Sequence, residues 1–236
     1  MGENKIRGLL PDDDRFFSVD AVSKLRKAQE EIHYLLNHNY PMKSTTTFVG
    51  NHHQLTVRQI IALTRATSSG WSIENRKLKE LKPSDIHGRT VHIDGFNLII
   101  TIEVALSDGM LFRGMDGCVR DLAELRGTYR LIPQTVQAIE IVRESLEELG
   151  AEGVVFYLDQ PVSNSGRLKT AIMESDWRID LDVQIVRNPD AVLKEMSNVV
   201  TGDAIILDEC ESWFNLVGYM LKKDKFQKLT RIINLN

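Results

Sequence analysis

Short apolar runs that alternate with helical stretches limit the fold of this chain more than any other feature. Gly153 to Leu158 is almost continuously apolar, and Pro133 to Leu149 before it carries apolar residues at helical spacing. A strand that is apolar at nearly every position is buried on both faces, which is typical of parallel sheets covered by helices. The same pattern predicts four further strands and a helix, in order Thr90 to Ile93, Leu181 to Val186, Asn198 to Thr201, Ser212 to Leu221 (the helix) and Leu229 to Ile233. Residues 90–236 are therefore expected to form a three-layer α/β domain around a parallel sheet.

The chain before residue 90 has a different pattern, which predicts a small helical domain. From Ser18 to about Asn37 apolar residues recur at helical spacing, and Ser18 is a suitable N-cap. Thr56 can cap another helix that runs to about Ala66. We expect a surface arm at 1–17, a helical domain at 18–67, a linker at 68–89 and the α/β domain at 90–236.

Composition and length point to an ordinary globular protein. No run approaches the roughly 18 consecutive apolar residues of a membrane span, and Met1 to Leu10 lacks the apolar run of a signal peptide. A cytoplasmic protein without a membrane partner is expected. Cys118 and Cys210 have no CxxC spacing, which favours two buried free thiols over a disulfide or zinc site. Walker A, GxGxxG and GxSxG patterns are absent, so motor ATPases, dinucleotide oxidoreductases and serine hydrolases lose support.

The net charge of −4 hides an asymmetry between the two parts of the chain. Residues 1–89 hold 14 Lys and Arg against 10 Asp and Glu, whereas residues 90–236 hold 15 against 23. A basic module beside an acidic one suits a protein that holds a polyanion near a cation site, and an ordinary solvated surface accounts for it equally well. Lys43, Arg58 and Arg65 are expected on one side of the helical domain.

Three aspartates directly follow predicted strands. Asp94, Asp159 and Asp203 each stand at a strand exit, and ligands of parallel α/β sheets bind beyond the carboxyl ends of the strands. Repulsion between neighbouring carboxylates is relieved by a hard cation such as Mg²⁺ or Mn²⁺, which can activate water and polarise a phosphoryl oxygen. A single aspartate at such a place is more often a helix cap. Three together favour a metal site with these residues as ligands and catalytic groups.

The first strand exit, His92-Ile93-Asp94-Gly95-Phe96-Asn97-Leu98, resembles the NYN domains, which are relatives of PIN nucleases. Thr201-Gly202-Asp203 is similar to the Thr-x-Asp of a later strand in those nucleases, and Phe156-Tyr157-Leu158-Asp159 is similar to an intervening strand. The resemblance covers residues 90–236 and implies a PIN/NYN-like fold with a metal-dependent nuclease site. Gly95 permits a tight turn, and the Asn97 amide can hold the loop or contact substrate.

The resemblance leaves the fourth acidic residue open, because PIN nucleases place one on an intervening helix. Asp121, Glu103 and Glu124 compete for this role, and Asp208 with Glu209 could supply an acid near Asp203. Asp121 ranks first as a further metal ligand. Asp121 and Glu124 would share one face if their segment is helical.

A second resemblance concerns the whole chain. Tyr34-Leu35-Leu36-Asn37, Tyr40-Pro41 and Val49-Gly50-Asn51 resemble an uncharacterised domain-of-unknown-function family, and the likeness extends to residues 159–167. In that later segment Ser163, Asn164 and Ser165 can cap a helix, and the Arg167 guanidinium can pair with a phosphate. These four residues are candidate substrate contacts. A capped helix whose arginine binds a neighbouring carboxylate is an equal alternative.

The combined sequence evidence favours a Mg²⁺- or Mn²⁺-dependent nuclease, with RNA preferred over DNA. Asp94 and Asp203 would bind the metal, Asp159 would assist or bind a second ion, and the helical domain would grip the nucleic acid. Two alternatives stay open: a non-catalytic protein that binds nucleic acid or a partner, and a phosphohydrolase that acts on small molecules. The absence of an aromatic-rich basic groove favours the last of these. The sequence also leaves open a homodimer.

Overall fold

The computed structural model describes residues 7–123, 127–223 and 231–235. Its first part is helical, and the two helices expected there are confirmed. Helix α2 is capped by Ser18, whose hydroxyl accepts the N–H of Ala21, and α4 begins with a capping box between Thr56 and Gln59. The segment between them forms a further helix, α3. The helices of this part are α1 (Asp13–Phe16), α2 (Val19–Asn37), α3 (Met42–His52), α4 (Val57–Ala66) and α5 (Gly70–Lys79).

Helix α5 lies in residues that were expected to be a linker. Ser69 caps its start by accepting the N–H of Ser72. Apolar periodicity is weak here because the helix is held mainly by polar contacts: the Trp213 indole N–H donates to the carbonyl of Arg76 at 2.7 Å, and the Arg76 side chain is buried. Tertiary contacts therefore decide the structure of a segment whose local sequence reads as a connection. A short 3₁₀ helix, Pro83–Asp85, follows.

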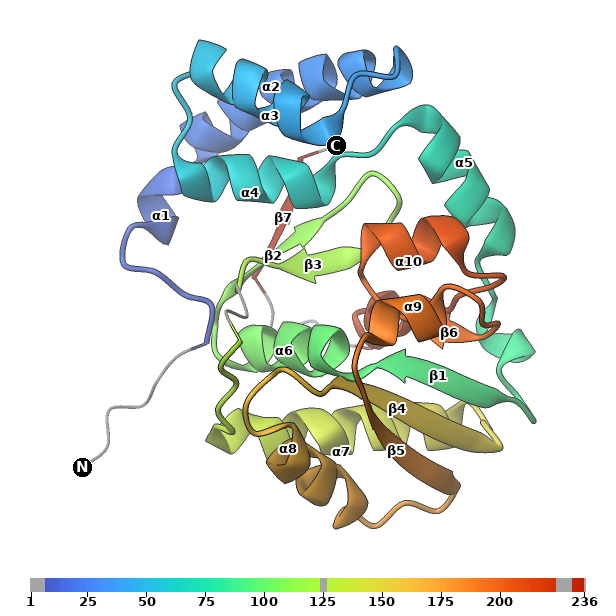
Figure 1. Cartoon of the computed structure of the whole chain (residues 1–236). Helices are drawn as coiled ribbons and strands as arrows, with labels where there is room; N and C mark the ends of the chain where they lie inside the picture. Colours follow the sequence, from blue (N-terminus) through green and yellow to red (C-terminus); the bar gives the residue numbers. More distant parts are fainter. Residues whose placement is uncertain (1–6, 124–126, 224–230, 236) are drawn as a thin grey trace.

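The second part contains a parallel sheet, as expected from the apolar runs, and the structure shows that its strand order is β5-β4-β1-β6. Helices lie between the strands in the chain and against the sheet in space (Figure 1). The result is a mixed α/β fold. Its strands are β1 (Thr90–Asp94), β4 (Gly153–Asp159), β5 (Asp180–Val186) and β6 (Val199–Val200). Its helices are α6 (Gly95–Leu106), α7 (Pro133–Glu148), α8 (Ser165–Met173), α9 (Pro189–Leu193), α10 (Ala204–Glu209) and α11 (Leu216–Met220).

Alternate residues of the strands point to two separate cores. Val154 and Phe156 of β4 pack in the core that includes α6, α7 and α8, whereas Tyr157 packs with residues of α9 and α10. The same alternation in β1 places Val91 and Ile93 in the first core. Because side chains two residues apart share a face, His92 and Asp94 belong to the face of Tyr157.

A second, three-stranded sheet was not predicted. It has the order β3-β2-β7, with β2 (Met110–Arg113) antiparallel to β3 (Val119–Asp121) and parallel to β7 (Arg231–Asn234). The expected last strand therefore exists, although it joins this sheet instead of the main one and its first residues lie outside the described part. Asp116 and Gly117 form the turn between β2 and β3, as expected.

This small sheet lies against the helical part and completes its core. Phe17 and Phe112 pack edge to face with ring centroids 4.8 Å apart, and Met110, Leu122 and Leu235 are buried among the residues of α2 and α4. Both cysteines are free and buried, as predicted. Across the described residues, none of the helices combines the length and the apolar character that crossing a membrane requires.

Candidate functional site

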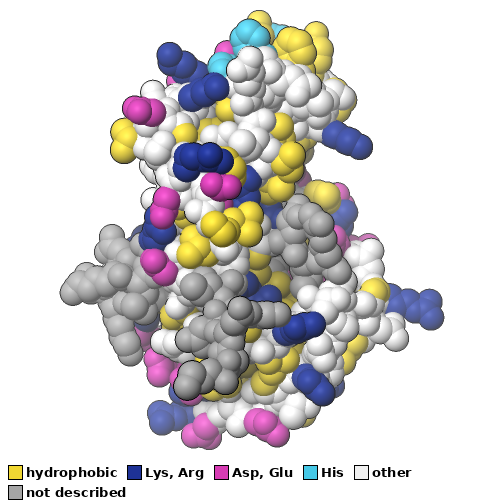
Figure 2. All heavy atoms as spheres, turned by 90° about the vertical axis from the view of Figure 1, so that its left-hand side faces the viewer, with side chains coloured by type: hydrophobic (Ala, Val, Ile, Leu, Met, Phe, Trp, Pro, Cys, Tyr) yellow, Lys and Arg dark blue, Asp and Glu magenta, His cyan; other side chains and the backbone are white. Residues whose placement is uncertain are grey.

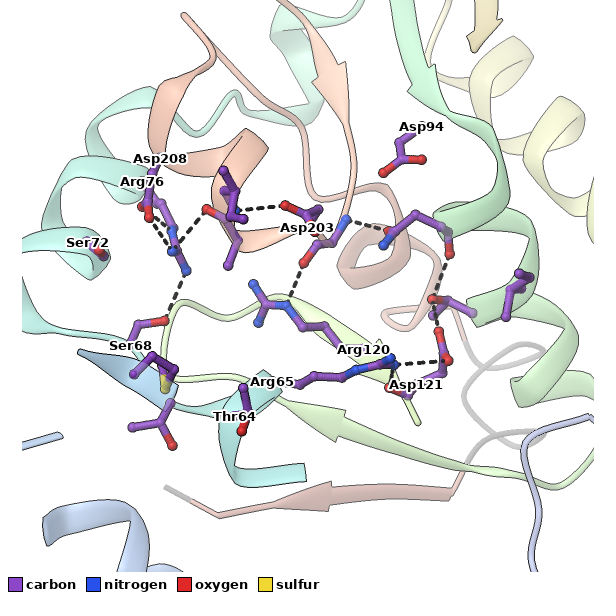
Figure 3. A pocket seen from close by; sticks show the side chains of 18 of the residues that line it. Thr64, Arg65, Ser68, Ser72, Arg76, Asp94, Arg120, Asp121, Asp203 and Asp208 are labelled. Carbon is purple, nitrogen blue, oxygen red and sulfur yellow. Dashed lines mark hydrogen bonds and ion pairs between the residues drawn. The ribbon is translucent and has the colours of Figure 1, made fainter. Parts of the chain in front are cut away.

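A cavity of about 690 Å³ lies where the helical part meets the carboxyl ends of the main-sheet strands. In Figure 3, Asp94 lies at one end of this cavity and Ser68 and Ser72 lie at the other, with Asp203 between them. Asp159 and Asn97 also line it, so the three predicted strand-end aspartates face one space. The position agrees with the general location of ligand sites in parallel α/β sheets.

Asp94 ends β1, and α6 begins at the next residue without a loop. This abrupt connection requires glycine at position 95, because a Cβ there would lie 2.5 Å from Cδ2 of Leu158 and 3.0 Å from the carbonyl oxygen of Tyr157. The glycine therefore permits close packing of α6 against β4. Asp94 is only 7% exposed, and its Oδ2 accepts a hydrogen bond of 2.8 Å from the Thr201 hydroxyl.

The β6 exit is fixed to the β1 exit by hydrogen bonds. The Gly202 N–H donates to Oδ1 of Asn97 at 2.7 Å, and the Gly202 carbonyl accepts from Nε of Arg120 at 2.6 Å. The Asp203 N–H donates to the Thr201 hydroxyl at 2.9 Å. Asp203 is also the N-cap of α10, since its Oδ1 accepts hydrogen bonds from the N–H groups of Ile205 and Ile206. Asn97 thus holds the neighbouring loop, and Asp203 combines a capping role with a place in the cavity.

The carboxylates at this edge of the sheet disturb one another. Burial raises the pKa of Asp94 to about 7, against the lowering effect of the Thr201 hydroxyl, and the negative charges of Asp203, Asp190 and Asp159 raise it further. Burial and then the charge of Asp190 raise the pKa of Asp159. An aspartate that is half protonated near neutral pH indicates a place where positive charge would be strongly favoured.

Asp190 was missed by the sequence reasoning. It lies in the first turn of α9, and its own pKa is raised by burial and by the charge of Asp203. Asp190 comes four positions after the end of β5, so a rule that considered only acids directly after strands did not find it. It escaped notice because two residues separate the strand end from the start of the helix.

The carboxylate oxygens at this edge of the sheet are the kind of ligand that Mg²⁺ or Mn²⁺ prefers, but they are not spaced as a complete coordination shell. Among residues 7–123, 127–223 and 231–235, no group of three or more His, Cys, Asp or Glu residues is close enough to form a ready metal cage. Mg²⁺ does not require one, because it commonly binds through one or two carboxylates and keeps several waters. Asp94 with Asp203 or Asp159 would provide that smaller set.

Asp121 lies in strand β3, and the helical face that it was expected to share with Glu124 does not form at this position. Its carboxylate lines the cavity and accepts from the Thr101 hydroxyl at 2.7 Å and the Ala123 N–H at 2.7 Å, with Arg65 paired at 3.4 Å. These donors already satisfy it without a metal. Glu124 lies outside the described residues.

Glu103 belongs to a separate buried cluster. It pairs with Arg7 at 2.5 Å, accepts from the Tyr129 hydroxyl at 2.6 Å and also binds the Thr135 hydroxyl. It does not line the cavity. Of the acids proposed near Asp203, Asp208 lines the cavity and pairs with Arg76, whereas Glu209 pairs with Lys194 at 3.1 Å.

The four predicted phosphate contacts after Asp159 lie outside the cavity lining. Ser165 donates to the carbonyl of Asp159 at 2.5 Å, and the Asn164 amide donates to the carbonyl of Tyr129 at 2.6 Å. The backbone N–H of Ser163 binds the carbonyl of Gly127, and the Arg167 side chain is exposed. This segment braces the β4 exit in the structure, and its contact with a substrate stays a prediction.

A network of largely buried ion pairs joins the helical part to the α/β part of the molecule. Arg76 of α5 pairs with both carboxylate oxygens of Asp208, at 2.7 and 2.9 Å, and with Asp116 at 2.5 Å. Arg120 pairs with the same Asp116 at 2.6 Å. Burial opposes the charge of Asp116, but Arg120 and Arg76 outweigh it and lower its pKa to about 2. This network could not be predicted from the sequence, because its members come from three segments that are far apart in the chain.

Two of the three basic residues expected on one side of the helical part are half-buried and paired with carboxylates. Arg58 pairs with the buried Asp13 at 3.0 Å, and Arg65 pairs with Asp121. Asp13 belongs to the arm at 1–17, so the described part of that arm is fastened to α4. Both guanidinium groups therefore have a structural role, because each is paired with a carboxylate of another segment.

Comparison with known proteins gives two family matches and one relative. Residues 83–219 match a domain of unknown function, DUF5616, and residues 24–79 match a protein family of unknown function, DUF434. An uncharacterized protein of Methanocaldococcus jannaschii is 34% identical over 187 residues, which cover 78% of this chain and 88% of the relative. No solved structure matches the chain.

Proposed function

This chain belongs to the DUF5616 family, and from its cavity we propose that it is a Mg²⁺- or Mn²⁺-dependent nuclease with RNA as the first expected substrate. The observation that carries the proposal is the buried Asp94, with its pKa raised to about 7 in a cavity that Asp159 and Asp203 also line. Keeping such a carboxylate without a counter-charge destabilises the fold. Ionisable residues that lower the stability of the fold in this way commonly belong to functional sites.

The likeness to NYN and PIN nucleases gains support from the contacts between its motifs. Asp94 and Asn97, from the first motif, bind Thr201 and Gly202 of the second through two hydrogen bonds. The bonded residues are 107 and 105 positions apart in the chain, so these hydrogen bonds fix the two motifs to one another at the site. A PIN/NYN-like arrangement of this edge belongs to the proposal.

Each residue of the site has a role in the proposed reaction. A divalent cation, when bound, would supply a hydroxide near neutral pH and polarise a phosphoryl oxygen. Asp94 and Asp203 would hold it, while Asn97 and Arg120 keep the Gly202 loop in place beside them. Asp159, with its raised pKa, is suited to accept a proton from the attacking water.

The test is Mn²⁺ binding by calorimetry together with cleavage of a labelled single-stranded RNA. We expect the wild type to bind Mn²⁺ and cut the RNA, and the double variant Asp94→Asn/Asp203→Asn to do neither. Asparagine is as good an N-cap as aspartate, so α10 should persist in this variant. Asp176→Asn is the matched control, because Asp176 is exposed beyond α8, before the strand start of β5 and away from the cavity.

A wild type that binds no Mn²⁺ would refute the proposal and would leave the strand-end aspartates as caps and structural groups. Binding of Mn²⁺ and RNA without cleavage would instead indicate a non-catalytic binding protein. The two results are separated in one experiment because binding and cleavage are measured on the same preparation.

A phosphohydrolase acting on small molecules is the second candidate. The cavity volume of about 690 Å³ is within the range of small-ligand sites, which is roughly 300–1,000 Å³. Figure 2 shows Lys and Arg side chains scattered among Asp and Glu on the face it presents, with no continuous basic track. Competition of nucleotides and other small phosphate esters with the labelled RNA distinguishes the two substrate classes.

A further inference from the structure

The cavity wall opposite the carboxylates is built by the helical part and differs from them in chemistry. It combines hydroxyl groups with apolar side chains: Thr64, Thr67 and Ser72 come from α4, its C-cap and α5, and Leu36 and Met42 come from α2 and α3. Figure 3 shows Thr64, Ser68 and Ser72 on this side, away from Asp94. Arg65 and Arg76 also line the cavity from the helical part, and each is paired with a carboxylate. A ligand that fills the cavity would meet the strand-end carboxylates at one end, and hydroxyl groups, apolar side chains and these paired arginines at the other.

Thr67 is the most informative residue of this wall. It is 2% exposed and lines the cavity, yet its hydroxyl has no hydrogen-bond partner within the described part of the chain. Its backbone N–H is satisfied by the carbonyl of Leu63, so the side chain alone is left over. A buried polar atom without a partner is costly, and a ligand that bonds to it recovers that cost.

The apolar members of the wall restrict what the ligand can be. Leu36 and Met42 are half-buried on the helical side, and Phe96 and Ile100 of α6 face the same cavity. Such side chains favour a group with apolar faces, whereas a sugar phosphate carries hydroxyls all round. A nucleobase has apolar faces and hydrogen-bonding edges, which match the apolar side chains and the Thr67 hydroxyl respectively.

We propose that this wall is a nucleobase pocket, which holds the base of a single nucleotide while its phosphate lies at the Asp94 end of the cavity. The placement of the phosphate rests on the proposed function; the pocket for the base rests on the wall. The volume of about 690 Å³ lies within the usual range of small-ligand sites and suits one nucleotide. The ligand is therefore a mononucleotide or the terminal nucleotide of a chain.

Binding of nucleoside 5′-monophosphates, ribose 5-phosphate and inorganic phosphate to the full chain tests the pocket by calorimetry, with and without Mn²⁺. We expect at least one of the four common ribonucleoside monophosphates to bind about tenfold more tightly than ribose 5-phosphate, which lacks only the base. Thr67→Val should weaken that nucleotide by about tenfold and leave ribose 5-phosphate unchanged. Valine keeps the shape and removes an unpartnered polar atom, so the variant should fold.

Thr45→Val is the matched control. Thr45 is also a buried threonine of the helical part, 3% exposed, with a hydroxyl that lacks a partner in the described chain, but it does not line the cavity. It should bind nucleotides like the wild type. Equal binding of every nucleotide and ribose 5-phosphate, or equal effects of Thr67→Val and Thr45→Val, would overturn the pocket.

The outcomes separate this inference from the proposed function. A base preference that depends on Thr67, in a protein that neither binds Mn²⁺ nor cuts RNA, supports the pocket and refutes the nuclease. Mn²⁺-dependent cleavage without any base preference supports the nuclease and refutes the pocket. If nothing binds, the pocket is refuted directly.

Competition with linear and circular RNAs of the same sequence identifies the source of the nucleotide. Competition by the linear RNA alone points to a chain end, and competition by neither points to a free mononucleotide. A circular RNA that competes as well as the linear one would contradict a pocket for a single terminal unit.

Discussion

Asp94→Asn should make the protein more stable by about 4 kcal/mol at pH 8 and by much less at pH 4. The pKa of Asp94 is raised from its ordinary value of 3.8 to about 7, and each unit corresponds to about 1.4 kcal/mol. Between these two pKa values the folded state keeps the proton that the unfolded state has released. The contribution of Asp94 to the free energy of unfolding is therefore most favourable below pH 4 and decreases as the pH rises to about 7. Asparagine does not titrate and does not suffer this loss. Urea denaturation at pH 4, 6 and 8 measures the difference.

A divalent cation should stabilise the wild type at pH 8 more than it stabilises Asp94→Asn. In the wild type at pH 8, Mn²⁺ or Mg²⁺ should raise the melting temperature, because an ion that binds only the folded state stabilises it. Asp94→Asn should respond weakly, and Asp176→Asn should behave like the wild type at every pH. A stability difference between wild type and Asp94→Asn that stays constant from pH 4 to pH 8 would show that Asp94 does not titrate as described.

Replacing Arg76 by methionine should destabilise the protein by about 3 kcal/mol at neutral pH, since it removes one of the two cationic partners of a buried carboxylate. The Arg76 side chain is 3% exposed and that of Asp116 is fully buried and keeps only Arg120 of these two partners, while Asp208 loses both of its bonds to the guanidinium. The loss should shrink as the pH falls from about 4 toward 2, because Arg120 and Arg76 together lower the pKa of Asp116 to about 2 and a protonated Asp116 no longer requires the second cation. Urea denaturation at pH 7 and pH 3 gives both values.

Arg15→Met provides the comparison for that experiment. Arg15 pairs with Asp12 at 3.3 Å, but the two side chains are 73% and 58% exposed. Exposed pairs of this kind contribute little, so a change below about 1 kcal/mol is expected. Similar losses from Arg76→Met and Arg15→Met would mean that the Arg76 network is not buried in solution.

The apolar periodicity of the sequence predicted the main sheet well, but of the small sheet it predicted only the strand β7. Val154 to Leu158 is apolar at each position because helices cover both faces of β4, which is a strong local signal. Strands β2 and β3 are four and three residues long, and Arg113 and Arg120 interrupt their apolar pattern. Their structure depends on pairing with β7, which lies more than a hundred residues away and leaves no trace in the local pattern.

The candidate site shows a similar division. A rule of position, acids directly after strands, was enough to single out Asp94, Asp159 and Asp203, and the structure gathers them in one cavity. The opposite wall could not be predicted, since Thr67 resembles any residue that follows a helix, and its place beside the cavity depends on the packing of α4 against β2. Arg65 was identified as basic, but its pairing with Asp121 depends on a strand that was not expected.

The helical part cannot finish folding early during synthesis. Phe17 near its start packs against Phe112, and Leu235 is buried in the same core, so residues from almost the whole described chain must be present before that core closes. A nascent chain that has emerged only as far as α5 would expose apolar faces of α2 and α4 to water. Such long-range closure slows folding and leaves partly made chains prone to association. Expression of the helical part by itself should therefore give aggregation, and joint expression with the remainder of the chain is the arrangement in which its apolar faces are covered.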